Sequence, residues 1–247
     1  MEKITSVTNE TIKETAKLHQ KKFREETGLF ISEGEKAIEG IIEAGYKVIS
    51  VFKADEKEFA KLKGDKNFIV NEAVLNKISS TKSPCRIVAV AKQKKYELNN
   101  FSKMNKLILL ENIKDAGNLG TILRACKAFG VEGVLLLGNT IDLYNPKVVR
   151  ASVGCFDIPV INIDYKDIKL FKEHTIYSTA LYENSKPLKD VNFKLPFIIA
   201  FGSEAEGLTK EFLKNKTENI KIETTPKVES LNLASAVSIC LYEVFSK

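Results

Sequence analysis

Two hydrophobic patterns alternate along this chain. Short apolar runs, such as KLILLE at 106–111, GVLLLG at 133–138 and PFIIAFG at 196–202, are typical of strands that are buried on both faces. Between these runs, apolar residues recur at intervals of three and four, as they do along one side of an amphipathic helix. Strands that alternate with helices in this way predict an α/β fold with a mostly parallel sheet.

The pattern divides the chain into a small first domain, a linker and a larger second domain. Residues 1–95 are expected to form a small α/β domain, and the polar, aperiodic stretch 96–105 indicates a linker. The elements expected in the first domain are helices over 8–27, 37–44, 55–62 and 71–79 and strands over 29–34, 47–54, 67–70 and 86–93. Gly28 and Gly45 are expected to end the first two helices.

Residues 106–247 are expected to form the second domain, built on a parallel sheet. Its expected strands cover 106–111, 133–138, 160–163, 175–181, 196–202 and 219–223. Its expected helices cover 119–129, 146–153, 165–172, 209–216 and 231–246. In open sheets of this kind, ligands bind at the loops that follow the carboxyl ends of the strands.

The composition indicates a globular, cytoplasmic protein. Hydrophobic residues make up 44% of the 247 positions and charged residues 28%, which is the balance of a folded chain rather than a disordered one. No apolar run approaches the roughly 20 residues that span a membrane, and the N-terminal residues lack the apolar segment of a signal peptide. The net charge of +6 permits a polyanionic partner such as RNA.

The cysteines argue against a metal site. Cys85, Cys126, Cys155 and Cys240 form no CxxC pair, and three of them have apolar neighbours. This indicates free thiols in a reducing compartment. Zinc sites need clustered cysteine and histidine, and the chain has only two histidines. We therefore expect no bound metal.

Three loops that follow predicted strands carry an amide or a carboxylate, and the first two of them also carry glycine. They are Asp115–Gly120, with Arg124 on the helix behind it, Gly202–Gly207, and Thr225–Asn232. Taken singly, each has a structural explanation, in which Asn118 and Ser230 cap helices and the glycines form turns. A phosphate-binding loop and a serine hydrolase are disfavoured, because the chain has no GxxxxGK[ST], no GxGxxG and no GxSxG.

Taken together, the three loops resemble the signature motifs of the SpoU (TrmH-like) ribose 2′-O-methyltransferases of the SPOUT class. The matching residues are Asn118 and Arg124 in the first motif, Gly202, Glu204 and Gly207 in the second, and Ser230, Leu231 and Asn232 in the third. This resemblance covers residues 106–247. Residues 1–95 resemble, less closely, the ribosomal-protein-like RNA-binding module that precedes this domain in several members. One departure is that Ile222 is followed by Glu223 rather than proline, and Pro226 stands near the position of a family glycine.

The resemblance implies a trefoil-knotted domain that binds S-adenosylmethionine and works as a homodimer. The residues that would bind this cofactor are Gly202, Gly207, Ile222, Leu231 and Thr179. Structured RNA would be the substrate, bound by basic residues of the first domain, Lys21, Lys22 and Arg24. The alternative for these three is an ordinary solvated helix face, because Glu14, Glu25 and Glu26 dilute the charge.

The implied reaction is methyl transfer to a ribose hydroxyl. The resemblance makes Arg124 the base, with Asn118, Glu204, Ser230 and Asn232 positioning it, the ribose and the loops. Arginine almost never loses its proton, so two roles remain open. Arg124 either takes the hydroxyl proton in an unusual, phosphate-coupled state, or it binds an RNA phosphate while the proton leaves by another route.

Ribosomal RNA is the substrate we expect, because of the module that precedes the second domain. The alternatives are a transfer-RNA ribose 2′-O-methyltransferase, a resistance methylase of the thiostrepton type, and a non-catalytic knotted RNA-binding protein in ribosome assembly. The intact motif residues Asn118, Arg124, Glu204, Ser230 and Asn232 argue against the non-catalytic alternative.

Overall fold

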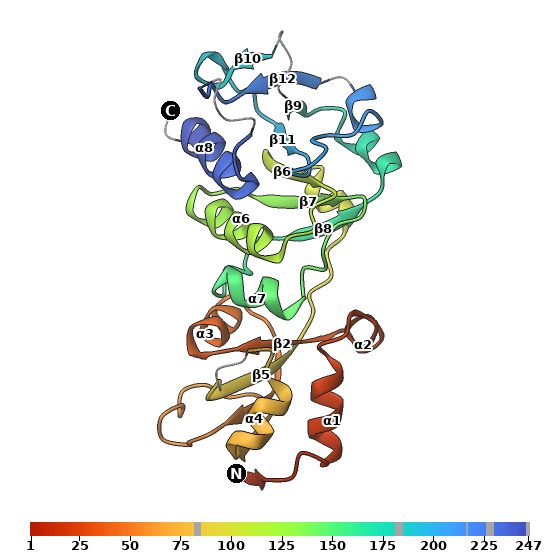
Figure 1. The fold of residues 1–247 in the computed structure, drawn as a ribbon. Coiled ribbons are helices and arrows are strands. Elements are labelled where there is room, and N and C mark those ends of the chain that lie inside the picture. Colours follow the sequence, from red (N-terminus) through yellow and green to blue (C-terminus); the bar gives the residue numbers. More distant parts are fainter. Residues whose placement is uncertain (82–84, 181–184, 216, 226–229, 246–247) are drawn as a thin grey trace. The chain divides into compact units, whose positions relative to one another are not determined.

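The chain forms two compact units in the computed structural model, which describes residues 1–81, 85–180, 185–215, 217–225 and 230–245 (Figure 1). The first unit contains Met1–Lys94 and Asp142–Asp157, and the second contains Lys95–Ile141 and Ile158–Lys247. The sequence predicts one domain over the whole of 106–247, whereas the structure groups Asp142–Asp157 with the N-terminal unit.

The first unit is a five-stranded sheet with helices on both faces. Its strands, in sheet order, are β1 (Glu2–Ile4), β4 (Lys66–Val70), β3 (Val48–Lys53), β5 (Ile87–Lys92) and β2 (Leu29–Glu33). β1, β4 and β3 are parallel, while β5 runs antiparallel to both of its neighbours. The helices are α1 (Glu10–Lys17), α2 (Lys21–Thr27), α3 (Glu35–Glu43), α4 (Glu72–Ile78) and α7 (Pro146–Ser152).

An aromatic cluster explains why the segment 142–157 belongs to this unit. Tyr144 and Phe156 from the segment pack on the buried rings of Phe30 and Tyr46, and the centroids of Phe30 and Tyr144 are 4.7 Å apart. Burial of four large rings is a strong apolar driving force. No regular spacing of apolar residues in the sequence predicts this cluster, because its rings come from positions far apart in the sequence.

Two predictions for the first unit are wrong. The sequence predicts one helix over 8–27, but the structure breaks it into α1 and α2, because the guanidinium of Arg24 binds the carbonyl oxygens of Leu18 and His19 between them. The helix predicted over 55–62 is instead a series of turns, in which the carbonyl oxygens of Phe59 and Leu62 accept hydrogen bonds from the ammonium group of Lys53. Gly28 ends α2 with a φ of 66°, as predicted.

The second unit is built on a seven-stranded sheet in which every pairing of named strands is parallel, as predicted. In sheet order the strands are β10 (Lys186–Pro187), β12 (Thr217–Lys221), β9 (Thr175–Thr179), β11 (Phe197–Phe201), β6 (Lys106–Glu111), β7 (Gly133–Leu137) and β8 (Val160–Ile163). The two long helices α6 (Ala116–Ala128) and α8 (Leu233–Phe245) lie side by side on one face (Figure 1).

The opposite face of this sheet is covered by short elements. They are the short helix α5 (Leu98–Phe101) and the 3₁₀ turns η1 (Tyr165–Phe171) and η3 (Phe212–Lys214), whereas a third 3₁₀ turn, η2 (Leu188–Asp190), packs against α8. Together α5, η1 and η3 bury Phe101, Phe171 and Phe212 in one core with β6 and β7. The predicted linker 96–105 is therefore wrong, because Phe101 is fully buried. The predicted helix over 209–216 is only the short turn η3.

Candidate active site

Hydrogen bonds join the three loops singled out by the sequence at one edge of the second unit. The side-chain amide of Asn118, in the first turn of α6, donates to the carboxylate of Glu204 in the loop after β11. The amide of Asn232 donates in turn to the side-chain oxygen of Asn118, at 3.0 Å. Residues that lie 86 and 114 positions apart in sequence are thus brought into direct contact, as the loop pattern predicts.

Helix capping fixes two of these loops. The carboxylate of Asp115 accepts from the backbone N–H of Asn118 at 2.7 Å and caps α6. Asn232 directly precedes α8 and caps it, because its side-chain oxygen accepts from the backbone N–H of Ser235 at 3.2 Å. The structural explanation that Asn118 and Ser230 are caps is therefore wrong, and Asn118 is left free to bridge Glu204 and Asn232.

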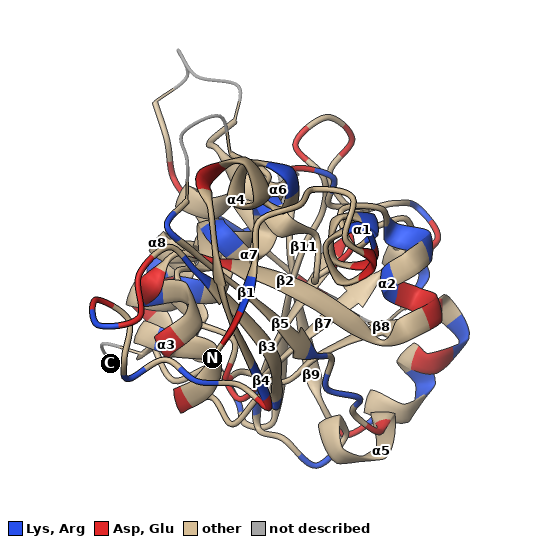
Figure 2. Ribbon diagram, turned by 90° about the horizontal axis from the view of Figure 1, so that it is seen from below, with Lys and Arg blue, Asp and Glu red and all other residues tan. Residues whose placement is uncertain are grey.

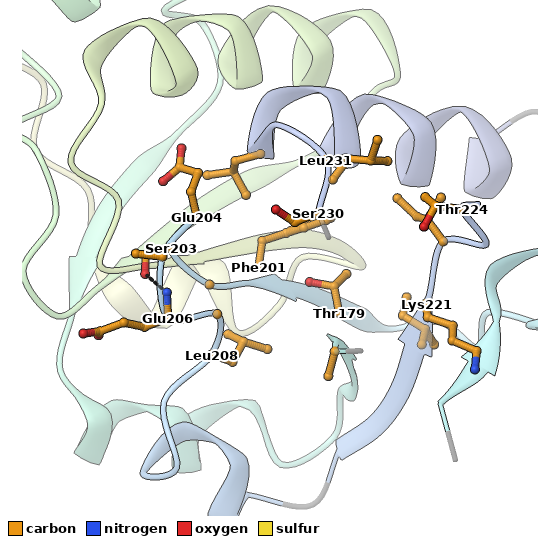
Figure 3. Close-up of a pocket in the computed structure, with 18 of the residues that line it drawn as sticks. Thr179, Phe201, Ser203, Glu204, Glu206, Leu208, Lys221, Thr224, Ser230 and Leu231 are labelled. Carbon is orange, nitrogen blue, oxygen red and sulfur yellow. Dashed lines mark hydrogen bonds between the residues drawn. The ribbon is translucent and has the colours of Figure 1, made fainter. Parts of the chain in front are cut away.

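A pocket of about 490 Å³ lies beside this network (Figure 3). Its walls come from the ends of β9, β11 and β12, from the loop after β11 and from the start of α8. The lining residues that the sequence singles out are Thr179, Gly202, Glu204, Gly207, Ile222, Ser230 and Leu231. Apolar side chains of Leu208, Leu213 and Leu233 complete it. Such a mainly apolar hollow with a few polar groups is typical of a small-molecule site.

The loop after β11 folds back on itself so closely that only glycine fits at its first position. A Cβ atom on Gly202 would lie 1.9 Å from the carbonyl carbon of Gly207. Gly207 has a φ of 66°, which favours glycine, and its N–H donates to the carbonyl of Ser203 at 2.9 Å. The two glycines of the second motif therefore shape one wall of the pocket.

Arg124 lies apart from the hydrogen-bonded network. It is exposed on α6, and no hydrogen bond or ion pair joins it to another described residue. Asn118 and Asn232 are not among the residues that line the pocket, while Ser230 and Glu204 are. The five predicted catalytic residues are thus distributed between a network, a pocket wall and an exposed helix face. Pro226 lies outside the described residues.

The basic residues predicted to bind RNA divide into two groups. Lys21 and Lys22 are exposed on α2, a helix that carries charges of both signs, and they pair loosely with Glu25 and Glu26 at 3.6 and 3.8 Å (Figure 2). Arg24 is only 2% exposed, and its donors bind protein atoms, so the prediction that it contacts RNA is wrong. The number of charges on the helix cannot distinguish these cases, since the carboxylate that pairs with Arg24 belongs to Asp142, 118 positions away.

Two polar residues of this edge are not among the predicted site residues. Asp115 is the cap of α6, and Glu111 is a fully buried carboxylate at the end of β6. The signal for Glu111 is a charge at the last position of an otherwise apolar run, KLILLE. Among the described residues no group of histidine, cysteine and acidic side chains is arranged to hold a metal ion, and no helix is long and apolar enough to cross a membrane.

Two family models match the chain. The model of the SpoU rRNA Methylase family matches residues 105–242, and that of an MRM3-like substrate binding domain matches residues 9–89. The first covers the second unit's pocket and network. The second covers most of the N-terminal unit.

Individual relatives match over nearly the full length. An uncharacterized tRNA/rRNA methyltransferase from Synechocystis is 33% identical over 97% of this chain and 92% of its own. The 23S rRNA (guanosine(2553)-2′-O)-methyltransferase RlmP of Bacillus subtilis is 29% identical over 99% of both chains. The crystal structure of an AdoMet-bound rRNA methyltransferase from Sinorhizobium meliloti superposes with a TM-score of 0.88, at 28% identity over 98% of this chain and 97% of that one.

Proposed function

We propose that this chain, which belongs to the SpoU rRNA methylase family, transfers the methyl group of S-adenosylmethionine to a ribose 2′-hydroxyl of ribosomal RNA. The observation that carries the proposal is the contact of Asn118, Glu204 and Asn232 next to a pocket of about 490 Å³. The RlmP relative is a 2′-O-methyltransferase of 23S rRNA, which supports the choice of RNA and of the reacting hydroxyl. The family-typical trefoil knot is part of this proposal.

The pocket fits S-adenosylmethionine. The apolar walls around Leu208, Leu213 and Leu231 suit an adenine ring, and backbone groups of Gly202 and Ile222 suit its polar edge. Gly202 and Gly207 approach too closely for any side chain at position 202, so the wall they form is bare backbone. Thr179 donates its hydroxyl proton to the carbonyl of Ala200 at 3.0 Å, so its oxygen remains able to accept a hydrogen bond. When bound, the cofactor supplies a methyl group on a positively charged sulfur.

The protein's own part in the reaction is to orient the ribose and to assist the loss of its proton. A ribose hydroxyl is a poor nucleophile, so orientation and proton transfer dominate the rate gain. Asn118 and Asn232 hold the carboxylate of Glu204 in place, while Ser230 on the pocket wall is placed to orient the ribose. An exposed arginine stays protonated, which favours the phosphate-binding role for Arg124 over the role of base.

The active enzyme is a homodimer, in which the exposed side of α8 packs on a second copy of this chain. Ile239 and Tyr242 lie one turn apart on α8 and are 41% and 63% exposed, which is high for apolar side chains. Arg124 lies on the neighbouring helix α6. Light scattering should give twice the chain mass, and a Tyr242→Asp variant should shift the protein to the monomer.

The exposed lysines Lys21 and Lys22 contribute to RNA binding. Their glutamate partners are exposed and more than 3.5 Å away, so they can exchange carboxylate for phosphate at little cost. Affinity for RNA should fall steeply with salt, because phosphate contacts release counterions. A Lys21→Ala/Lys22→Ala variant should lower that salt slope by about 1 to 2. An unchanged slope would remove both lysines from the RNA-binding surface.

The proposed function is tested by binding and then by transfer. Titration calorimetry should show S-adenosylmethionine binding to the purified protein. Tritium from the labelled methyl group should then appear in ribosomal RNA, and nuclease digestion should recover it in 2′-O-methyl nucleosides. Transfer RNA is assayed in parallel. Label in a base, or binding without transfer to any RNA, would overturn the proposal.

A further inference from the structure

A carboxylate is buried behind the pocket without a cation to neutralise it. Glu111, the last residue of β6, has 0% of its surface exposed. No ion pair among the described residues includes it. An isolated buried carboxylate is costly unless several hydrogen bonds satisfy its oxygens. Glu111 therefore stays buried because of the donors around it.

Three donors from two segments bind this carboxylate. One oxygen accepts from the hydroxyl groups of Tyr165 at 2.5 Å and Thr209 at 2.6 Å. The other accepts from the backbone N–H of Thr209 at 2.8 Å. Burial and the hydrogen bond to Glu111 raise the pKa of Tyr165, so its phenol keeps the proton that it donates.

The residue that Glu111 binds is Thr209, which directly follows the loop Gly202–Leu208 at the pocket wall. Thr209 directly follows Leu208, and Leu208 lines the pocket with Gly202–Gly207 before it. The hydroxyl of Thr209 also accepts from the backbone N–H of Phe212 at 3.1 Å, which begins η3. Glu111 itself is followed directly by the loop that leads to Asn118. One carboxylate thus fastens the second motif's loop to the strand from which the first motif's loop departs.

We propose that Glu111 is a positioning residue for the methyl-transfer reaction. It touches neither cofactor nor RNA, and it acts through Thr209 by fixing the far end of the loop Gly202–Leu208, and with it one wall of the cofactor pocket. This inference rests on the proposed function, since it assigns the pocket to S-adenosylmethionine.

The variant Glu111→Gln tests this role. The amide has the same shape as the carboxylate, but its NH₂ group must face either the backbone N–H of Thr209 or the two hydroxyl groups, and a proton that is now donated to that oxygen loses its acceptor. We expect the Kd for S-adenosylmethionine to rise at least tenfold, while the KM for RNA stays within twofold of wild type. A Tyr165→Phe variant, which removes one donor and keeps the carboxylate, should raise that Kd less.

A control separates positioning from general loss of stability. Ile168→Val truncates a buried side chain in the core that also contains Phe101, Phe171 and Phe212, and it leaves Glu111 and its three donors unchanged. At a temperature where both variants are fully folded, Ile168→Val should bind S-adenosylmethionine as wild type does. If Glu111→Gln also binds it within twofold of wild type, or if both variants lose affinity equally, the role assigned to Glu111 is wrong.

A double variant tests the route through Thr209. When Glu111 acts only through that residue, Glu111→Gln combined with Thr209→Val should bind S-adenosylmethionine no more weakly than the weaker single variant. If the increases in Kd of the two single variants multiply in the double variant, this route is contradicted. The two proposals fail differently: a wild-type protein that does not bind S-adenosylmethionine overturns the proposed function, whereas binding by wild type and Glu111→Gln alike overturns only the role of Glu111.

Discussion

The guanidinium of Arg24 binds the carboxylate of Asp142 through two nitrogens, Nη2 at 2.6 Å and Nε at 2.8 Å from Oδ2. The other carboxylate oxygen accepts from the backbone N–H of Tyr144 at 2.9 Å. Asp142 is the first residue of the segment that joins the N-terminal unit from the middle of the chain. The pair therefore fixes the point at which this segment enters the unit.

Breaking this pair should destabilise the N-terminal unit. Arg24 is 2% exposed and Asp142 17%, and removal of one partner leaves the other charge without its counter-ion in a largely buried setting. Arg24→Met or Asp142→Ala should lower the free energy of unfolding by about 3 to 5 kcal/mol. Urea unfolding followed by circular dichroism measures the change.

The matched control is Lys22→Met on the same helix. Lys22 is exposed and its glutamate is 3.8 Å away, so its loss should leave stability almost unchanged and should weaken RNA binding instead. Equal unfolding midpoints for Arg24→Met and Lys22→Met would refute the structural role of Arg24.

Gly202→Ala should remove cofactor binding. The new Cβ atom would lie 1.9 Å from the carbonyl carbon of Gly207 and 2.2 Å from the nitrogen of Leu208, and backbone atoms cannot yield as a flexible side chain can. We expect the Kd for S-adenosylmethionine to rise at least a hundredfold in calorimetry. Gly130→Ala is the control, because it meets open space at a φ of 67°. It should cost about 1 kcal/mol of stability and leave the Kd unchanged.

Arg124→Ala should keep cofactor binding and lose turnover. Arg124 is not among the described residues that line the pocket, so the Kd for S-adenosylmethionine should not change. Methyl transfer in a single-turnover assay should fall at least a hundredfold. Near-wild-type transfer would show that the arginine of the first motif has no catalytic part here.

The base and phosphate-clamp roles of Arg124 predict different pH profiles. The Arg124→Lys variant keeps the charge but loses the planar fork. If Arg124 is a phosphate clamp, this variant should have a reduced rate of methyl transfer with an unchanged pH dependence. A base would give Arg124→Lys a profile displaced toward lower pH, because lysine loses its proton more readily than arginine. A displaced profile would contradict the clamp.

The buried thiols should make the protein less stable in alkali. Burial raises the pKa of Cys126 and of Cys240 to about 12, whereas the unfolded chain loses these protons near pH 9. Unfolding therefore releases protons between these values, so the stability from both thiols is complete below pH 9 and is lost as the pH rises toward 12. Cys126→Ala should flatten this alkaline decline in urea unfolding curves measured from pH 8 to 10.5. A decline as steep as that of wild type would contradict the assignment.

Local patterns predict the second unit well because its strands are buried apolar runs. β6 and β8 have the predicted bounds, and the loops that follow β6 and β11 meet at one edge, as parallel strands require. The poor fit of Asn232 to a helix interior has a simple cause, since it is the cap of α8 rather than a residue within it. These features depend on neighbours close in sequence or on sheet direction alone.

Features that depend on distant partners could not be predicted. Arg24 has the sequence context of a surface arginine, yet it is buried and pairs with Asp142, 118 residues away. Phe101 lies in a polar stretch and is buried against Gly133, where a Cβ atom would lie 2.9 Å from its ring. Such pairings require knowledge of which segments meet in space, and hydrophobic periodicity does not contain it.

Mapping of ribose methylation in cells tests the central claim most directly. Ribosomal RNA from cells that lack this gene should be missing one 2′-O-methyl group, and the wild-type gene should restore it while the Arg124→Ala gene should not. An unchanged set of 2′-O-methyl sites in the ribosomal RNA of the deletion strain, or restoration by Arg124→Ala, would contradict the account.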